Sequence, residues 1–332
     1  MAGLKAMVLA AGVGERMRPL TDHHPKPLLP VANRPVMGWV LTHLARHGFK
    51  EVIANLHYRA EDIVERMGPG SEYGVELTFS YEEELLGSAG GVRRCREFFG
   101  DETFLVTGAD DLTTMDLTSL LAAHREVGAM ASIALVEVEE TSQYGIVVTD
   151  EEGRIQRFVE KPRGRAPSRT ANTQIYLFEA EVLDLIPPDQ VYDFGFQVFP
   201  AMVEAGVPFY GFRLDGYWRD IGSIRDYLEA QTDALEGRLD GAIEGNEVSP
   251  GVWMGKGCLV ERGAKLVPPV LLGGNCRVGA KARVGEGTVV GAGAEVGAGA
   301  GVWKSVVWDG ARVPASSKLR ETVVTAEGVF RG

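Results

Sequence analysis

Several features that define other classes of protein are scarce in this sequence. Its 332 residues include three cysteines, Cys95, Cys258 and Cys276, and no Cys-x-x-Cys pair. This argues against a disulfide framework or a cysteine zinc site, and it fits a reducing compartment. No apolar run approaches the roughly 18 residues that span a membrane, and the stretch 6–11 is too short for a signal-peptide core. We therefore expect a cytoplasmic protein with no membrane partner.

Basic charge is also in short supply. The chain has 34 Lys and Arg against 46 Asp and Glu, which gives a formal net charge of -12 at pH 7. Nucleic acids and anionic membranes attract basic surfaces, so neither is an expected partner. A site for phosphates would have to gather its cations locally. Histidine is rare as well, with six in the chain and none after His124.

Up to residue 235, short apolar runs alternate with amphipathic segments. This alternation predicts βαβ units and an α/β fold, a Rossmann-like domain at 1–235 with a mixed, doubly wound sheet. Strands are expected at 5–9, 51–55, 75–80, 103–107, 131–138, 145–148, 155–159, 174–178 and 209–213, and helices at 35–47, 60–67, 88–98, 117–127, 179–185, 196–205 and 223–235. A glycine-containing linker is expected at 236–248.

Beyond the linker, large apolar residues recur at every sixth position. They are Met254, Val260, Leu266, Leu272, Val278, Val284, Val290, Val296, Val302 and Trp308. This period is typical of a parallel β-helix, in which six residues form one side of a triangular coil and the aliphatic side chains stack inside. We expect a left-handed β-helix at 249–332 rather than a flexible Gly- and Ala-rich tail. It would provide the contacts of a homo-oligomer.

The segment 9–31 carries the first chemical motif. After a predicted strand come four small residues, Ala10, Ala11, Gly12 and Gly14, which let a phosphate approach the backbone N–H groups. Arg16 adds a planar cation, and Lys26, between two prolines, adds a compact one. The motif lacks the third glycine of a dinucleotide fold and the Gly-Lys-Ser/Thr of a P-loop. It predicts a phosphate-binding loop rather than an ordinary turn.

This segment resembles the first motif of the sugar-1-phosphate nucleotidyltransferases, also called nucleotide-sugar pyrophosphorylases. The resemblance implies that a nucleoside triphosphate and a sugar 1-phosphate are the substrates and that Arg16 and Lys26 are catalytic. The segment 86–91 is similar to the family's second nucleotide loop, which implies nucleotide contacts from Gly87, Ser88, Ala89 and Gly90. Taken alone, this run is equally readable as a helix start capped by Ser88.

Two aspartates match the family's magnesium ligands. Asp110 follows Gly108-Ala109 at the end of a predicted strand, where relatives usually have Asn-Gly-Asp. In open α/β sheets ligands gather at such strand ends. Asp220 stands in Tyr217-Trp218-Arg219-Asp220-Ile221-Gly222, which resembles the family's Trp-x-Asp-Ile-Gly. The resemblance implies that Asp110 and Asp220 hold Mg²⁺ and that Asp110 is catalytic, and it leaves a role for Asp111 open.

Three further segments resemble the half of the site that binds the sugar phosphate. They imply contacts from Gly145, Glu160, Lys161 and Asn172. Glu160 would accept hydrogen bonds from sugar hydroxyls, and Lys161 would neutralise the sugar's phosphate. Outside this context, Glu-Lys-Pro is as readily a surface turn.

The substrates and the activity leave alternatives open. The size of the repeat domain and the segment 55–58 resemble mannose-1-phosphate guanylyltransferases, which implies GTP with mannose 1-phosphate, while UTP or dTTP with glucose 1-phosphate is the alternative. A six-residue β-helix also forms many acyltransferase domains, but those commonly use a histidine base and none follows His124. Non-catalytic regulatory relatives tend to lose the charged residues that this chain keeps. Because an ionised phosphate oxygen is the nucleophile, the chemistry needs positioning and charge rather than a general base.

Overall fold

The computed structural model of the chain describes residues 3–331, which form two compact units. Unit 1 consists of Met1–Val13 and Val40–Trp218, and unit 2 consists of Gly14–Trp39 and Arg219–Gly332. Both units are therefore discontinuous in sequence. The domain boundaries at 235 and 249 stay predictions, because the units are defined by packing and not by chain order.

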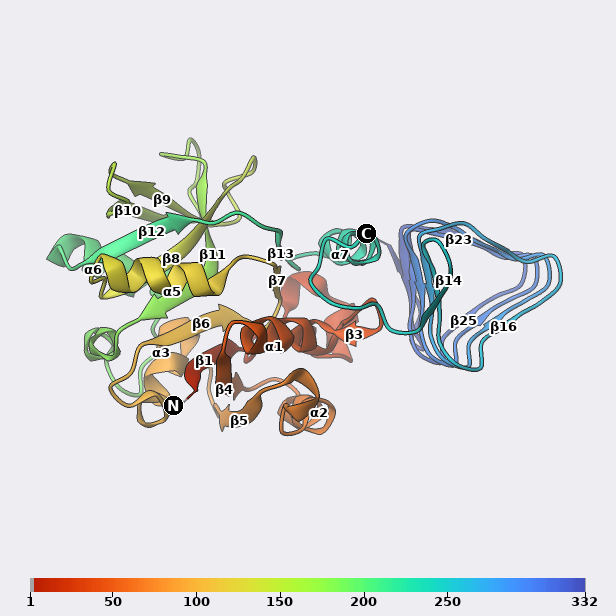
Figure 1. Cartoon of the computed structure of the whole chain (residues 1–332), viewed down its shortest axis with the longest axis horizontal. Helices are drawn as coiled ribbons and strands as arrows, with labels where there is room; N and C mark the ends of the chain where they lie inside the picture. Colours follow the sequence, from red (N-terminus) through yellow and green to blue (C-terminus); the bar gives the residue numbers. More distant parts are fainter. Residues whose placement is uncertain (1–2, 332) are drawn as a thin grey trace. The chain divides into compact units, whose positions relative to one another are not determined.

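The sheet of unit 1 is mixed, as its pattern predicted. Its central path is β10-β9-β11-β6-β1-β4-β5; β8 branches from β11, and β12 pairs with β8 (Figure 1). The four strands β6, β1, β4 and β5 are parallel, whereas β11 is antiparallel to β6, β8 and β9. The bounds are β1 (Leu4–Leu9), β4 (Phe49–Leu56), β5 (Glu76–Tyr81), β6 (Phe104–Gly108), β8 (Ala131–Glu137), β9 (Gly145–Thr149), β10 (Ile155–Glu160), β11 (Thr170–Phe178) and β12 (Phe209–Arg213).

The helices follow the predicted order with three local differences. The predicted helix 88–98 is broken at Cys95 into α3 (Gly87–Arg94) and α4 (Arg96–Phe99), because Cys95 leaves helical dihedrals. The segment 179–185 forms a 3₁₀ helix, Ala180–Leu185, and the last helix of unit 1 starts with a π-helical turn, Phe194–Val198, before α6 (Phe199–Ala205). The others are α1 (Val36–Arg46), α2 (Ala60–Met67) and α5 (Leu117–Glu126).

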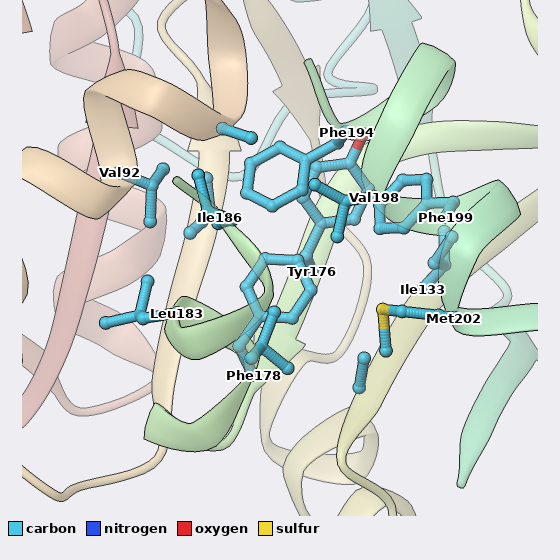
Figure 2. Close-up of a cluster of buried hydrophobic side chains, with 14 of the residues drawn as sticks. Val92, Ile133, Tyr176, Phe178, Leu183, Ile186, Phe194, Val198, Phe199 and Met202 are labelled. Carbon is cyan, nitrogen blue, oxygen red and sulfur yellow. The ribbon is translucent and has the colours of Figure 1, made fainter. Parts of the chain in front are cut away.

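Aromatic side chains fill the core on one face of this sheet. Phe178, Phe194 and Phe199 are almost fully buried, and Phe194 stacks on Phe178 with 5.0 Å between ring centroids. Figure 2 shows these rings beside Tyr176, with Val92 of α3 and Leu183 in the same cluster. Burial of each ring contributes on the order of 2 kcal/mol. The packing fixes the segment around Phe194 against the sheet and beside α3.

Unit 2 contains the predicted β-helix, built from three sheets of parallel strands, the first of which has an antiparallel strand added at each end. The seven-stranded sheet runs β14-β15-β18-β21-β24-β27-β28, and two four-stranded sheets run β16-β19-β22-β25 and β17-β20-β23-β26. Strands β14 (Asn246–Ser249) and β28 (Val329–Arg331) pair antiparallel at the two ends of the first sheet. The strands between are β15 (Val252–Met254), β16 (Leu259–Val260), β17 (Lys265–Leu266), β18 (Val270–Leu272), β19 (Arg277–Val278), β20 (Arg283–Val284), β21 (Thr288–Val290), β22 (Glu295–Val296), β23 (Gly301–Trp303), β24 (Val306–Val307), β25 (Arg312–Val313), β26 (Lys318–Arg320) and β27 (Thr322–Val324). The left-handed winding stays a prediction.

The six-residue register was wrong at its last position. Val302 lies opposite Val284, as an eighteen-residue coil requires, but Val290 lies opposite Val307 and not opposite Trp308. The coil is therefore one residue shorter between Val302 and Val307. Val307 takes the place in the stack, and the Trp308 side chain is freed for other contacts.

The rest of unit 2 is the segment 14–39 and α7 (Ile224–Leu235). The segment contains three 3₁₀ turns, Glu15–Met17, Leu20–Asp22 and Lys26–Leu28, and a short hairpin of β2 (Pro30–Val31) and β3 (Arg34–Pro35). Helix α7 starts after Ser223, whose Oγ caps it by accepting a hydrogen bond of 3.1 Å from the Asp226 amide. The predicted phosphate loop is thus divided, with Ala10–Gly12 in unit 1 and Gly14–Lys26 in unit 2.

Among residues 3–331, no helix is long and apolar enough to cross a bilayer.

Candidate active site

The backbone after β1 opens at Gly12, where a methyl group would meet no atom within 4 Å. Ala10 and Ala11 are buried beneath it. The Ala10 amide donates a hydrogen bond of 2.9 Å to Asn55 Oδ1, so that N–H group is already engaged inside the protein. Of the small residues predicted to bind phosphate here, Gly12 is the one with open space above its backbone.

The conformation at Gly14 explains the second glycine of the motif. Its φ of 71° lies in the left-handed region, which favours glycine over residues with a Cβ. A methyl group there would come within 3.0 Å of Thr21 Cγ2 and 3.4 Å of Lys26 Cβ. Thr21 Oγ1 also donates a hydrogen bond of 2.9 Å to Gly14 O. The close packing fixes the first 3₁₀ turn, which carries Arg16, against the turn that carries Lys26.

Arg16, Lys26 and Asp220 meet in unit 2, although Asp220 lies about two hundred residues away in sequence. Lys26 Nζ is 3.6 Å from Asp220 Oδ1, and Arg16 Nη2 is 3.7 Å from Asp220 Oδ2. The Lys26 and Asp220 side chains are 11% and 10% exposed, whereas Arg16 is 57% exposed. Arg16 and Lys26 thus bring two cations to one carboxylate in a protein whose net charge is -12. This is the local gathering of cations that a phosphate site requires.

Gly222 allows the Arg16 guanidinium to approach the Asp220 carboxylate. A methyl group on it would lie 3.0 Å from an Arg16 guanidinium nitrogen and 3.1 Å from Asp220 Oδ2. The glycine of the Asp-Ile-Gly motif is therefore explained by the lack of room for a side chain at this position.

Asp110 and Asp111 lie together at the end of β6 in unit 1. Both carboxylates fold over Gly108, where an added methyl group would collide with Asp111 Oδ2 and come within 2.7 Å of Asp110 Oδ1. One oxygen of each lies within 4.8 Å of the other. The Ala109 amide donates a 3.0 Å hydrogen bond to Leu9 O, which ties this turn to the end of β1. Asp111 is 1% exposed and was not assigned a role from the sequence.

Carboxylate oxygens are the ligands that Mg²⁺ prefers. Unit 1 offers such oxygens on Asp110 and Asp111, and unit 2 offers them on Asp220.

The second loop is held by a segment far away in sequence. Ser88 donates to Asp193 Oδ1 from both its amide and its Oγ, each at 3.0 Å, and the Ala89 and Gly90 amides donate to Tyr192 O at 2.9 and 3.0 Å. These amides are thereby engaged within the protein, so a nucleotide contact at this loop would have to use other atoms. Asp193, which was not among the predicted site residues, caps the first turn of α3.

A buried polar bridge joins the two loops of unit 1. Asn55 Nδ2 donates a 2.8 Å hydrogen bond to Glu82 Oε1, and Glu82 Oε2 accepts one of 3.0 Å from the Leu86 amide. Asn55 and Glu82 are 3% and 4% exposed. Because Asn55 also holds the Ala10 amide, the ends of β1, β4 and β5 are connected through these two side chains. A larger residue does not fit at Gly91, because its Cβ would lie 2.5 Å from Glu82 Oε1.

The predicted sugar-phosphate residues fall into two places. Gly145 and Glu160 face each other across β9 and β10, and Glu160 Oε2 lies 2.8 Å from where a Gly145 methyl group would be. Lys161 Nζ is 3.7 Å from Glu160 Oε1 and is 55% exposed. Burial raises the pKa of the Glu160 carboxyl, and the neighbouring Lys161 opposes that shift.

Asn172 serves the strand that carries it. Its Oδ1 accepts a 2.9 Å hydrogen bond from the Gln174 amide, and its Nδ2 donates one of 2.9 Å to the Tyr176 hydroxyl. The register of β11 against β8 is irregular between Asn172 and Tyr176, so the side chain stabilises a bulge. Burial raises the pKa of Tyr176, which keeps this hydroxyl protonated.

Comparison with known proteins agrees with these motifs. A family model described as "Nucleotidyl transferase" matches residues 5–237. A UTP–glucose-1-phosphate uridylyltransferase from Synechocystis is 39% identical over 83% of this chain and 80% of its own length. A mannose-1-phosphate guanylyltransferase from Mycobacterium tuberculosis is 34% identical over 81% of this chain and 78% of its own length.

A solved structure shows the same fold. A Bacillus anthracis protein assigned as a glucose-1-phosphate thymidylyltransferase superposes with a TM-score of 0.65 at 23% identity, over 72% of this chain and 97% of the other. The predicted α/β fold is confirmed. The chain therefore belongs to the nucleotidyl transferase family and is a sugar-1-phosphate nucleotidyltransferase.

Proposed function

We propose that the chain transfers a nucleoside monophosphate from a nucleoside triphosphate to a sugar 1-phosphate, with Arg16, Lys26, Asp110 and Asp220 at the reacting phosphates. The observation that carries this proposal is the cluster of Arg16 and Lys26 around Asp220. A phosphate oxygen of the sugar attacks the α-phosphorus, and the bond from that phosphorus to the α–β bridging oxygen breaks. Pyrophosphate leaves with the electron pair, and no proton has to be removed from the nucleophile.

The cations have separate tasks in this proposal. The largely exposed Arg16 binds the departing pyrophosphate, and the nearly buried Lys26 binds the phosphates at the reacting centre. Ala10, Ala11, Gly12 and Gly14 shape the backbone against which the triphosphate lies. Fixed charges aimed at the developing negative charge are commonly worth about 100-fold or more in rate each.

Mg²⁺ would be held by Asp110 and Asp220, with Asp111 as a further ligand. When bound, the ion neutralises phosphate charge and aligns the two substrates. The donor set fits, because carboxylates alone are supplied and no softer ligand competes at these positions. Without a bound ion, Lys26 and Arg16 balance the charge of Asp220.

The sugar phosphate would be bound by Lys161, and its hydroxyl groups by Glu160. Gly145 leaves the space that these side chains and the sugar need. The buried Asn172 amide acts on the sugar indirectly in this proposal, by fixing the bulge in β11 beneath it.

UTP with glucose 1-phosphate is the first substrate pair to test. The support is the 39% identity to the Synechocystis uridylyltransferase over most of both chains. GTP with mannose 1-phosphate, the pair implied by the sequence resemblance, is the second candidate and is supported by the guanylyltransferase relatives at 34–38% identity. An assembly of several copies through the β-helix stays a prediction.

A matrix of nucleoside triphosphates against sugar 1-phosphates, read by pyrophosphate release, tests both candidates. One pair should exceed the others in kcat/KM by at least about tenfold, which corresponds to about 1.4 kcal/mol of transition-state discrimination. Equal rates with UTP and GTP would contradict a preference for one base. Release of pyrophosphate without the sugar 1-phosphate would contradict the transfer itself.

A further inference from the structure

Trp308 of the β-helix contacts the segment that carries Lys26. The coil is one residue short between Val302 and Val307, so Trp308 does not enter the interior stack, and the side chain is nonetheless 8% exposed. What buries it is the rest of unit 2. Its ring meets the His24 ring edge to face, with 4.5 Å between centroids and 86° between planes.

A chain of hydrogen bonds continues from the indole. Trp308 Nε1 donates to the Tyr227 hydroxyl at 3.0 Å, and that hydroxyl donates to Pro30 O at 2.7 Å. Tyr227 is fully buried, so its hydroxyl cannot exchange these partners for bulk water. Proline has no N–H group, and its carbonyl is the one backbone hydrogen-bonding group that it offers.

Gln231 strengthens the same attachment. Its Nε2 donates to Pro30 O at 2.8 Å, and its Oε1 accepts from the Ala32 amide at 2.9 Å. Asn33 Nδ2 reaches Val290 O of β21 at 3.3 Å. The hairpin of β2 and β3 is therefore anchored to α7 by its own backbone and to the β-helix by the Asn33 side chain.

Lys26 lies between these two attachments. His24 precedes it by two residues, and Pro30 follows it by four. The turn between is short, because the Leu29 amide donates to Lys26 O at 3.1 Å. A shift of either attachment would be passed to the Lys26 backbone, and the ammonium group, 3.6 Å from Asp220, would move with it.

We propose that Trp308 and Tyr227 are positioning residues for Lys26, so that the β-helix takes part in nucleotidyl transfer by holding a catalytic cation. This inference rests on the proposed function through the role of Lys26. The β-helix touches no reacting atom in this proposal. A misplaced charge of this kind lowers turnover more than it lowers substrate affinity.

The test uses the full-length chain and the substrate pair found active. Trp308→Phe keeps a ring against His24 and removes the N–H donor, and Tyr227→Phe removes the hydroxyl that links Trp308 to Pro30. Trp303→Phe is the matched control, because Trp303 packs over Gly285 and Gly301 in the same β-helix. We expect kcat to fall about 3- to 10-fold in the first two variants, with the KM of the sugar phosphate unchanged and with the control near wild type.

A double-mutant cycle separates positioning from a general loss of structure. In a Lys26→Met background, adding Trp308→Phe should change the residual turnover less than about twofold, because the group that it positions is gone. An equal loss in both backgrounds, or wild-type turnover in Trp308→Phe, would overturn the inference. If Lys26→Met itself turned over like wild type, the role of Lys26 in the proposed function would fail instead.

Discussion

Among single residues, Asp220 has charged neighbours that the sequence around it could not predict. Arg16 and Lys26 come from two turns near the start of the chain and pair with it at 3.7 and 3.6 Å. The chain keeps all three charges close while Arg16 stays largely exposed. An exposed cation beside a nearly buried one suits a site that must both hold a phosphate and release one.

Replacing Arg16 with alanine should lower kcat by about 100-fold or more, because it removes one charge from the developing pyrophosphate. Arg18→Ala is the matched control. Arg18 lies on the same loop and is 55% exposed, but it pairs with Asp22. The two variants are compared by pyrophosphate release and by thermal unfolding. A folded Arg16→Ala enzyme as active as Arg18→Ala would refute the assignment.

Asp111 is the residue that the structure adds to the predicted metal ligands. Asp111→Asn keeps the shape of the side chain and removes its negative charge, so the Mg²⁺ concentration for half-maximal turnover should rise by about tenfold. The readout is a titration of pyrophosphate release with Mg²⁺, and the exposed Asp101→Asn serves as the control. Identical titration curves would show that Asp111 is structural.

The raised pKa of Glu160 predicts how the stability of the folded chain depends on pH. A carboxyl whose pKa is higher in the folded than in the unfolded chain binds more protons when folded, so its contribution to stability falls as pH rises above about 4.3, the ordinary value. Glu160→Gln should abolish this loss of stability, so the variant should become more stable relative to wild type as the pH rises from about 4 to about 7. Denaturant unfolding at several pH values gives the comparison, with the exposed Glu152→Gln as control. Parallel pH profiles of wild type and Glu160→Gln would contradict the cause assigned to the shift.

At the scale of elements, the loops of unit 1 depend on contacts between distant strand ends. Asn55 at the end of β4 holds the loop after β1, and Glu82 after β5 holds the start of α3. Asp193, from beside the buried aromatic ring of Phe194, caps α3 itself. The loops that we propose to contact the nucleotide are thus held in shape by side chains that the nucleotide need not touch.

Glu82→Ala should destabilise the chain by about 1–3 kcal/mol, because it leaves the buried Asn55 amide and the Leu86 N–H without their acceptor. Glu83→Ala, at an exposed neighbouring position, should change stability by less than about 0.5 kcal/mol. The free energy of unfolding in urea measures both. Equal values would show that the bridge between the loops adds nothing to stability.

Element types could be predicted from the sequence where the signal is local. The alternation up to residue 235 and the six-residue period are periodicities, and the strands and helices of the structure follow them. The shortened coil could not be predicted, because Val307 and Trp308 are both apolar and either fits the pattern. The same limit applies to Asp193 and Asp220, whose partners are about a hundred or more residues away and whose own neighbours carry no sign of them.

For the whole molecule, the boundaries of the compact units differ from those of the region that matches the family model. The matched region ends at residue 237, yet residues 14–39 pack in the same unit as the β-helix. Pro30 and Asn33 carry that packing through side chains of α7 and through β21. We therefore expect the folding of residues 14–39 to depend on the β-helix.

A chain truncated after residue 248 should lose this support. It would expose the buried Tyr227 and the apolar surface under Pro30, so we expect a lower unfolding temperature or no cooperative transition, and turnover reduced by more than about tenfold. Circular dichroism during heating and pyrophosphate release provide the two readouts. A truncated chain with native stability and turnover would show that the β-helix is dispensable.

The most direct measurement of the central claim is ³¹P NMR of one reaction mixture containing the enzyme, a nucleoside triphosphate, a sugar 1-phosphate and Mg²⁺. The account predicts equal amounts of pyrophosphate and of a nucleoside diphosphate sugar, formed together and abolished by chelating the metal. Release of inorganic phosphate or pyrophosphate without the diphosphate sugar would contradict it.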